Sequence, residues 1–262
     1  MNTDLRGKRA IVCGSTQGIG KAVAEELASL GASITLLARN EQKLQEVQAA
    51  LPAADGQQHH YVVTDFSRPD YLKSAIGSYL EGVDEVHILL NNTGGPPAGK
   101  LYEAAPEDFL KAFDMHIVCN QLLVQAVLPK MQKAGYGRII NIISTSVKEP
   151  IPGLGVSNTT RGAVASWAKT LAAELGPMGI TVNNVLPGST NTSRIWALVK
   201  NRAQAQGKSE EAVAEDMKAQ IPLRRFAEPS ETAAAVAFLA SPAAAYITGV
   251  SLPVDGGKIG CL

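Results

Sequence analysis

The sequence predicts a doubly wound α/β fold, in which helices cover both faces of a parallel β-sheet of about seven strands. Short apolar runs rich in β-branched residues alternate along the chain with longer segments whose apolar residues recur at helical spacing. A glycine-rich turn joins the first such run to the first helical segment. Because no repeat, low-complexity tract or linker interrupts the alternation, residues 1–262 are expected to form a single domain.

Composition and charge indicate a compact protein that acts on a small molecule. The 262 residues are 45% hydrophobic and only 18% charged, as expected of a chain with a substantial core. Basic and acidic residues number 24 each, so no basic field predicts binding to nucleic acid or to an anionic membrane. The N-terminus lacks an apolar signal segment, which predicts a cytoplasmic protein. The three scattered cysteines offer no zinc spacing, so no metal is expected.

A dinucleotide-binding turn is predicted after the first strand. The run RAIVCG is followed by the turn GSTQGIG and by a helix that ends near Gly31. Gly14 would allow a tight turn, Gly18 would let the backbone approach a pyrophosphate, and Gly20 would permit close packing. Free N–H groups at the helix start would hold the anion, the alternative being a purely structural turn. The residues expected at the cofactor here are Gly14, Ser15, Gln17, Gly18, Ile19 and Gly20.

The end of the second predicted strand bears on the choice of cofactor. The strand SITLLA ends at Ala38, where folds that bind NAD(H) usually carry Asp or Glu, and Arg39 follows it. A guanidinium suits the 2′-phosphate of NADP(H), which a carboxylate at this place would repel. The sequence therefore favours NADP(H) over NAD(H), the alternative being that Arg39 is a solvated loop residue.

Residues 137–163 are expected to carry the chemistry. A β-branched run predicts a buried strand that ends at Ser144, and the carboxyl ends of parallel strands face the ligand crevice. After a loop rich in Pro and Gly comes an amphipathic helix with Ser157 and Arg161 near its start. Because these two residues are four positions apart, they face the same way.

The turn, the strand-end serine and the following helix resemble the short-chain dehydrogenase/reductase family, whose members have a Rossmann-type fold. The spacing Gly-x-x-x-Gly-x-Gly, the segment NNTGG and a Pro-Gly turn before Thr192 match its motifs over roughly residues 5–258. In the family, a Tyr follows the strand-end Ser, and a Lys stands four residues after the Tyr. Here Ser144 is followed by Ser157 and Arg161 in those places, and no Tyr elsewhere has Lys four residues on. This pattern resembles a divergent subgroup, similar to β-ketoacyl-carrier-protein reductases, that lacks this Tyr and Lys.

The resemblance implies a set of cofactor contacts beyond the glycine turn. Asp65 would contact the adenine, Asn91 would help to shape the floor of the groove, and Thr192 would bond the pyrophosphate or the carboxamide. Residues at about 190–222 would form a variable lid over the substrate. The further cofactor residues that the resemblance implies are Asp65, Phe66, Asn91, Gly94, Arg161, Pro187, Gly188 and Thr192.

The resemblance also implies the catalytic residues Ser144, Ser157, Arg161 and His116. In the family the Tyr donates a proton to the carbonyl oxygen as hydride arrives, the Lys lowers the pKa of the Tyr, and the Ser steadies the oxygen. Ser157 is a weaker acid than Tyr, while Arg161 keeps the charge of the Lys. His116, inside a long helix predicted between residues 106 and 133, stands where the family usually has a water-binding Asn. An ordinary pKa of about 6.5 would suit His116 to a proton relay, the alternative being a packed, hydrogen-bonded histidine.

The sequence therefore predicts an NADP(H)-dependent oxidoreductase that interconverts a carbonyl and an alcohol through an atypical proton relay. Its substrate would be a small molecule that the sequence does not identify. The alternative is a pseudoenzyme that binds the nicotinamide dinucleotide as a sensor or partner subunit, because the usual Tyr and Lys are replaced. By resemblance to the family, the chain is expected to form a homotetramer through its long middle helices and its last strand.

Overall fold

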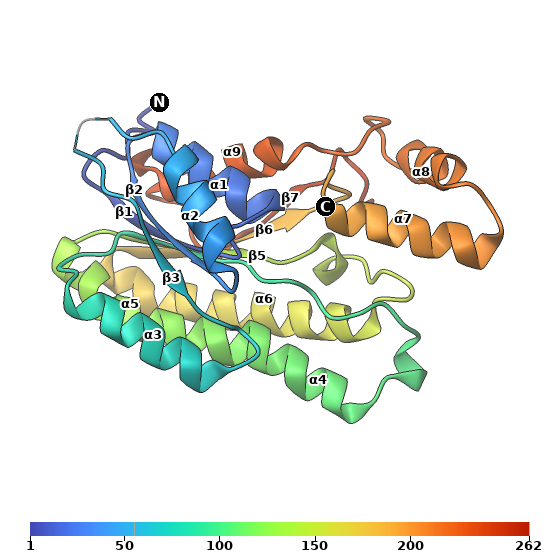
Figure 1. The fold of residues 1–262 in the computed structure, drawn as a ribbon, viewed down its shortest axis with the longest axis horizontal. Coiled ribbons are helices and arrows are strands. Elements are labelled where there is room, and N and C mark those ends of the chain that lie inside the picture. Colours follow the sequence, from blue (N-terminus) through green and yellow to red (C-terminus); the bar gives the residue numbers. More distant parts are fainter. Residues whose placement is uncertain (55, 262) are drawn as a thin grey trace.

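The computed structural model describes residues 1–54 and 56–261, which form the parallel sheet that the sequence predicts (Figure 1). Seven strands lie in the order β3-β2-β1-β4-β5-β6-β7, and each neighbouring pair is parallel. The strand order reverses between β1 and β4, so a ligand crevice is expected at the carboxyl ends of these two strands. The strands are β1 Arg9–Cys13, β2 Ser33–Ala38, β3 His60–Val63, β4 Ile88–Asn91, β5 Gly137–Ile142, β6 Ile180–Pro187 and β7 Ser251–Val254.

Helices form a layer on each face of the sheet. Figure 1 shows α1, α2 and α9 on one face, α3 to α6 on the other, and α7 with α8 apart from both layers at the right of the view. None of the helices in the described part of the chain is long and apolar enough to cross a membrane. The α-helices are α1 Gly18–Ser29, α2 Glu41–Ala50, α3 Pro69–Glu81, α4 Pro106–Phe113, α5 Cys119–Ala134, α6 Gly155–Leu175, α7 Ser193–Gln206, α8 Glu210–Ala219 and α9 Pro229–Ala240.

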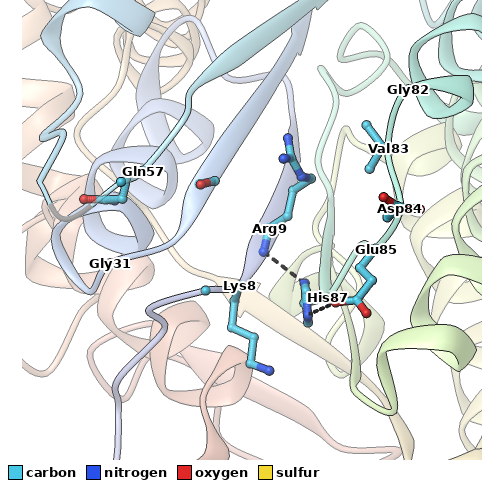
Figure 2. A pocket seen from close by; sticks show the side chains of 12 residues that line it. Lys8, Arg9, Gly31, Gln57, Gly82, Val83, Asp84, Glu85 and His87 are labelled. Atoms are coloured by element: carbon cyan, nitrogen blue, oxygen red, sulfur yellow. Dashed lines mark hydrogen bonds and ion pairs between the residues drawn. The ribbon is translucent and has the colours of Figure 1, made fainter.

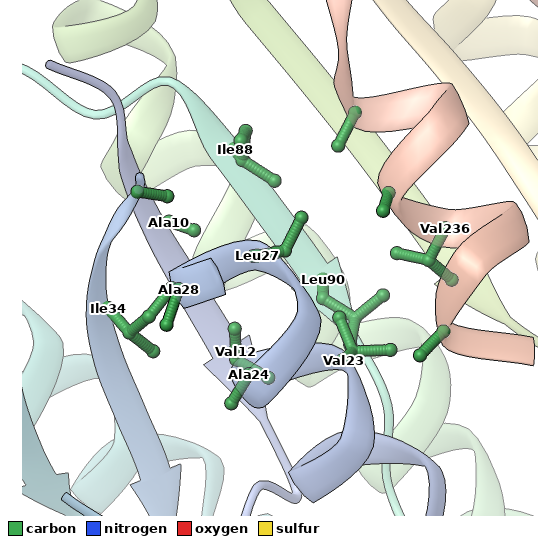
Figure 3. Packing of buried hydrophobic residues seen from close by; sticks show 14 of the residues in the cluster. Ala10, Val12, Val23, Ala24, Leu27, Ala28, Ile34, Ile88, Leu90 and Val236 are labelled. Carbon is green, nitrogen blue, oxygen red and sulfur yellow. The ribbon is translucent and has the colours of Figure 1, made fainter. Parts of the chain in front are cut away.

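The alternation of side chains along β1 divides the core into two clusters. Val12 points toward α1 and α9, whereas Ile11 and Cys13 point toward α3 and α5. Figure 3 shows Val12 with Ala24 of α1, and Val236 of α9 lies in the same cluster. Since both faces of the strand are buried, its residues after Arg9 are all apolar and do not alternate with polar residues.

The long helix predicted between residues 106 and 133 is interrupted in the structure. Helix α4 ends at Phe113, a π-helical turn covers Asp114–Val118, and α5 continues from there. His116 lies within this turn. A single π-helical turn inside an α-helix often accompanies a functional site, because it redirects the side chains that it carries.

Helices α7 and α8 are packed by a small cluster of their own. Ile195 and Val199 of α7 contact Val213 and Met217 of α8, and Phe226 joins them from the following loop. This cluster is separate from the two that flank the sheet. The segment predicted as a lid at about 190–222 therefore corresponds to a helical pair that begins at the carboxyl end of β6.

Candidate active site

Glycine is required at the turn after β1 because the chain passes close to itself. Gly14 has φ +60°, and a Cβ atom there would lie 2.7 Å from the carbonyl oxygen of Asn92. A Cβ atom on Gly20 would collide with the carbonyl oxygen of Gly14. The Asn92 side-chain amide holds the turn by donating to the carbonyl oxygen of Cys13 at 3.1 Å. Asn92 was not predicted, although its position in the NNTGG segment was the available signal.

The start of α1 is open to an anion. Gly18 has φ +55°, and the N-cap residue Gln17 makes no side-chain hydrogen bond to the first turn. The backbone N–H groups of this turn therefore remain for a ligand. A Cβ atom on Gly18 would lie 3.3 Å from Cγ2 of Thr192. The structure thus brings Thr192 to the glycine turn, 174 positions earlier in the sequence, as a shared pyrophosphate site would need.

Three other predicted cofactor residues turn their side chains into the protein. Ser15 is fully buried and its hydroxyl donates to the carbonyl oxygen of Leu37 at 3.4 Å. Ile19 packs against the core beside α1. Phe66 is likewise buried in the core under α3. Ser15 and Phe66 can therefore offer a cofactor only their backbone, whereas Ile19 is partly buried.

The turn after β6 leads toward the site through a close approach of two chain segments. Gly188 follows Pro187, and a Cβ atom on it would lie 2.7 Å from the Cα atom of Asp255 after β7. Its N–H donates to the carbonyl oxygen of Val254 at 2.9 Å. This contact fixes the carboxyl ends of β6 and β7 beside each other and directs the chain to Thr192, the N-cap residue of α7.

Arg39 and Asp65 follow adjacent strands at the far side of the crevice. Ala38, the residue before Arg39, is aligned with Val63 of β3. Arg39 and Asp65 therefore follow neighbouring strand ends. The Asp65 carboxylate accepts hydrogen bonds from the Ser67 N–H at 2.9 Å and hydroxyl at 2.8 Å. Burial opposes ionisation, but these bonds and the charges of Arg39 and another arginine hold the pKa of Asp65 below its ordinary value. Arg39 itself is exposed and forms no ion pair within the described residues.

Three asparagines join the ends of the central strands. The Asn91 amide nitrogen donates to Oδ1 of Asn141 at 2.9 Å, and Asn141 donates to Oδ1 of Asn184 at 2.9 Å. All three are buried, and they lie on β4, β5 and β6. Because Oδ1 of Asn91 has no partner, one acceptor remains beneath the crevice. Asn91 thus lies at the end of β4 in a buried asparagine network, and its two partners were not among the predicted residues.

Ser144 stands at the carboxyl end of β5 with its hydroxyl hydrogen free. Its Oγ accepts the N–H of Ser146 at 3.1 Å, within the 3₁₀ turn Thr145–Val147. The side chain is half-buried, and no acceptor for its hydroxyl hydrogen is found among the described residues. Ser144 can therefore donate a hydrogen bond to an oxygen in the crevice.

Arg161 and Ser157 of α6 face the strand that carries Ser144. They are 8% and 7% exposed, so their spacing predicted their shared direction correctly. The Arg161 Nη1 donates to the carbonyl oxygen of Ile142 at 2.7 Å, two residues before Ser144. Burial, reinforced by the charge of Arg194, lowers the pKa of Arg161 to about 10, so it remains a cation at neutral pH.

His116 is held as a neutral imidazole. It is 2% exposed and its Nε2 has no hydrogen-bond partner. Burial and the charge of Arg161 lower its pKa to about 2, an effect that an interaction with the Gly94 backbone only partly opposes. The ordinary pKa that would suit His116 to a proton relay is not retained, because segments distant in sequence bury the ring and surround it with positive charge. The alternative interpretation, a packed histidine, describes this residue better.

Arg194, in the first turn of α7, is a residue of this site that sequence reasoning missed. Its Nη1 lies 3.3 Å from the carbonyl oxygen of Gly95, and its guanidinium lies flat against that glycine. Its charge contributes to the lowered pKa values of both Arg161 and His116, two of the residues predicted to be catalytic. The available signal was an arginine two residues after Thr192, at the start of the lid.

A second hollow lies at the opposite end of the sheet and is unrelated to these residues. It has a volume of about 340 Å³ and is lined by residues at the amino ends of the strands. Figure 2 shows Arg9 and His87 there, with the Arg9 N–H donating to Nδ1 of His87 at 3.1 Å. The described residues contain no group of three or more His, Cys, Asp or Glu that could hold a metal.

The residues around the crevice fit a nicotinamide dinucleotide. The glycine turn leaves backbone N–H groups for a pyrophosphate, and the exposed Arg39 stands at the end of β2, where the adenosine ribose binds in such folds. The Ser144 hydroxyl lies on the other side of the switch point, after β5.

Comparison with known proteins agrees with this geometry. Residues 14–258 match the family described as Enoyl-(Acyl carrier protein) reductase. The chain is 34% identical over 254 residues to Dehydrogenase/reductase SDR family member 4 of Oryctolagus cuniculus. This match covers 97% of this chain and 94% of the relative. It is 32% identical over 257 residues to the 3-oxoacyl-acyl-carrier-protein reductase FabG of Aquifex aeolicus (strain VF5), covering 98% and 99%.

Two solved structures are similar over nearly the whole chain. L-sorbose reductase from Gluconobacter frateurii, complexed with NADPH and L-sorbose, superposes with a TM-score of 0.93 at 30% identity and covers 100% of both chains. YwfH, described as an NADPH dependent reductase involved in bacilysin biosynthesis, gives a TM-score of 0.92 at 28% identity and covers 97% of this chain and 99% of that one.

Proposed function

The chain belongs to the short-chain dehydrogenase/reductase family, and from that premise we propose that it is an NADP(H)-dependent oxidoreductase that interconverts a carbonyl and an alcohol. The observation that carries this proposal is that the glycine turn and the Ser144 hydroxyl both follow the carboxyl ends of strands, β1 and β5, on either side of the point where the strand order reverses. Similar solved structures are described as an NADPH dependent reductase and as a reductase complexed with NADPH, which supports the choice of cofactor.

The preference for NADP(H) rests on the charges at the end of β2. Ala38 provides no carboxylate for a ribose 2′-hydroxyl, and Arg39 offers an exposed guanidinium without an ion-pair partner among the described residues. The nearby Asp65 carboxylate is engaged by Ser67. A 2′-phosphate would therefore meet an available cation at this position.

In the proposed reaction, bound NADPH supplies the hydride. The Ser144 hydroxyl donates to the carbonyl oxygen and stabilises the negative charge that develops there. The buried Arg161 adds positive charge to the same region. This charge also stabilises the developing oxyanion, so a weaker proton donor is sufficient. Ser157 faces this region in place of the family's Tyr, and we propose that its hydroxyl passes a proton from water to the oxygen.

Neutral His116 has a supporting role in this scheme. An imidazole with a pKa of about 2 does not exchange protons as an imidazolium near neutral pH. It can still orient a water by accepting or donating a hydrogen bond through its unpartnered Nε2. The atypical relay would therefore run through hydroxyl groups and water, with His116 fixing its geometry.

The experiment that tests this function is a screen of carbonyl compounds and alcohols, followed by NADPH absorbance. The unmodified protein should turn over at least one compound. The double variant Ser157→Tyr/Arg161→Lys should be run beside it, because it restores the residue types that the family uses. Turnover by the unmodified protein supports the atypical relay.

A pseudoenzyme is the second candidate, and the altered tetrad favours it. The Arg161 guanidinium is tied to the carbonyl oxygen of Ile142, so it does not reproduce a free lysine ammonium. This candidate predicts NADPH binding without turnover in the unmodified protein. Activity gained only by the double variant would support it over the enzyme, since both candidates require the same cofactor site.

We further propose that the chain forms a homo-oligomer, a tetramer by resemblance to its family. Leu110 and Phe113 of α4 are 66% and 38% exposed, and Val118 before α5 is 38% exposed. Large apolar side chains gathered on neighbouring turns of one helical segment are typical of a surface that another subunit covers. Light scattering at micromolar concentration should show a mass above that of one chain, and a monomer would contradict the proposal.

A further inference from the structure

The first turn of α7 carries Arg194, a cation that contacts the loop after β4. The Arg194 guanidinium lies on Gly95, with its Nη2, Cζ and Nη1 atoms 2.8, 3.1 and 3.3 Å from the position of a Cβ atom there. Only a glycine allows this approach. The contact joins the first turn of α7 to the loop after β4.

No acidic side chain neutralises this cation. Neither Arg194 nor Arg161 forms an ion pair with Asp or Glu within the described residues. Burial of Arg161 and the charge of Arg194 lower the pKa of Arg161, whereas the Arg194 side chain itself is exposed. The third ionisable group nearby, His116, is neutral. An anion bound to the accessible Arg194 guanidinium would therefore weaken the repulsion that Arg194 exerts on Arg161.

The position of Arg194 distinguishes a substrate anion from the pyrophosphate of the cofactor. The pyrophosphate belongs at the glycine turn, where Thr192 meets Gly18. Arg194 instead contacts Gly95, next to Gly94, whose backbone interacts with His116. It therefore lies toward the residues that would handle the substrate. A guanidinium binds a carboxylate through two parallel hydrogen bonds, a geometry that also orients the rest of the molecule.

We infer that the substrate is an oxo acid, whose carboxylate is bound by Arg194 while its carbonyl oxygen accepts the Ser144 hydroxyl. This inference rests on the proposed function as a reductase. In the balanced reaction the oxo acid, NADPH and one proton from water yield the hydroxy acid and NADP⁺. Arg194 is then a specificity-determining residue that selects acids over neutral carbonyl compounds.

The test compares short 2-oxo and 3-oxo carboxylates with the methyl ester of each, at saturating NADPH. The acids should have the higher kcat/KM. Arg194→Gln should raise KM for the acids by about 10- to 100-fold, the cost of losing hydrogen bonds to a charged group, and leave the esters and the Kd of NADPH unchanged. Arg194→Lys should keep part of the preference for the acids, because it retains the positive charge. Arg202→Gln, which removes a charge from the same helix α7 without acting on Arg161 or His116, is the matched control.

Three results would overturn the inference. Esters that react as well as acids would remove the need for a carboxylate. An Arg194→Gln variant that loses affinity for NADPH would assign the guanidinium to the cofactor. An equal loss in Arg202→Gln would indicate a general effect of charge.

A protein that turns over none of these compounds still decides the question by binding. Calorimetric titration of the NADPH complex with the same oxo acids should show binding that Arg194→Gln abolishes. In that case the anion site stands and the reductase function fails. Absence of binding would overturn the anion site itself.

Discussion

The two halves of the sheet make different demands on the sequence. At the turn after β1 a ligand would meet backbone, and glycine is required there by space, because a Cβ atom on Gly14 would strike Asn92 and one on Gly20 would strike the carbonyl oxygen of Gly14. On the side of β5 a ligand would meet the side chains of Ser144, Ser157 and Arg161. Where a ligand is bound by backbone, the residues must be small enough to fit, so few residue types are allowed. Where a ligand is bound by side chains, substitutions can change the chemistry of the site without changing the fold.

The largest expected effect tests the steric requirement of the first half. Gly14→Ala should abolish measurable NADPH binding and lower the free energy of unfolding by about 1–3 kcal/mol, because the new methyl group combines a left-handed backbone with a clash against Asn92. Gly207→Ala is the control, since Gly207 has φ +62° but nothing within 4 Å of its Cβ position. Cofactor titration and denaturant unfolding measure both quantities. Equal effects of the two substitutions would show that backbone strain alone, and not crowding, explains the glycine.

The next effect tests the chemistry of the second half. Ser144→Ala should lower kcat by about 10²-fold or more, because it removes a hydrogen-bond donor to the developing oxyanion, and should leave NADPH affinity unchanged. Ser146→Ala is the matched control, since its buried Oγ has no partner. Steady-state kinetics on any substrate found by the screen decide the matter. Turnover that survives Ser144→Ala intact would count directly against this assignment.

A smaller effect sharpens the comparison at the cofactor. Arg39→Ala should weaken NADPH binding by about 10- to 100-fold, as the loss of hydrogen bonds to a charged group does, and leave NADH binding unchanged. Arg68→Ala provides a control, because Arg68 also acts on Asp65 but follows β3 and packs on the Tyr71 ring. Titrations followed by nicotinamide fluorescence give both affinities. Equal affinity of the unmodified protein for the two cofactors would refute the role of Arg39.

The smallest expected effect concerns how the buried His116 changes the pH dependence of the free energy of unfolding. Because burial and Arg161 depress the pKa of His116 to about 2, the unfolded chain binds a proton below about pH 6.5 that the folded chain does not. Stability should therefore fall as pH drops from 7 to 5, and His116→Asn should remove about 1–2 kcal/mol of that fall.

A matched substitution separates His116 from the other buried histidine. The pKa of His87 is also lowered, to about 4, mainly by burial, so His87→Gln should reduce the same fall in stability. The two contributions should add, because the residues lie at opposite ends of the sheet. Denaturant unfolding at several pH values measures each one. A fall that neither substitution changes would show that other groups cause it.

The sequence by itself determined the architecture and the cofactor turn. Strands were predicted where β-branched runs end in turns, and the glycine spacing predicted the crowding that the structure shows at Gly14 and Gly20. These features are local, because a strand, a turn and a helix start are each set by a few consecutive residues. The shared direction of Ser157 and Arg161 followed for the same reason, from helical spacing.

Only the tertiary structure decided the electrostatics of the site. Arg194 reaches Gly95 across 99 positions of sequence, and its charge acts on His116, which lies in a π-helical turn that the helical pattern did not reveal. The pKa of His116 depends on burial and on charges from α6 and α7, none of which is adjacent to it in sequence. Burial and the field of distant charges are properties of packing, so the same residues in another arrangement would have had ordinary pKa values.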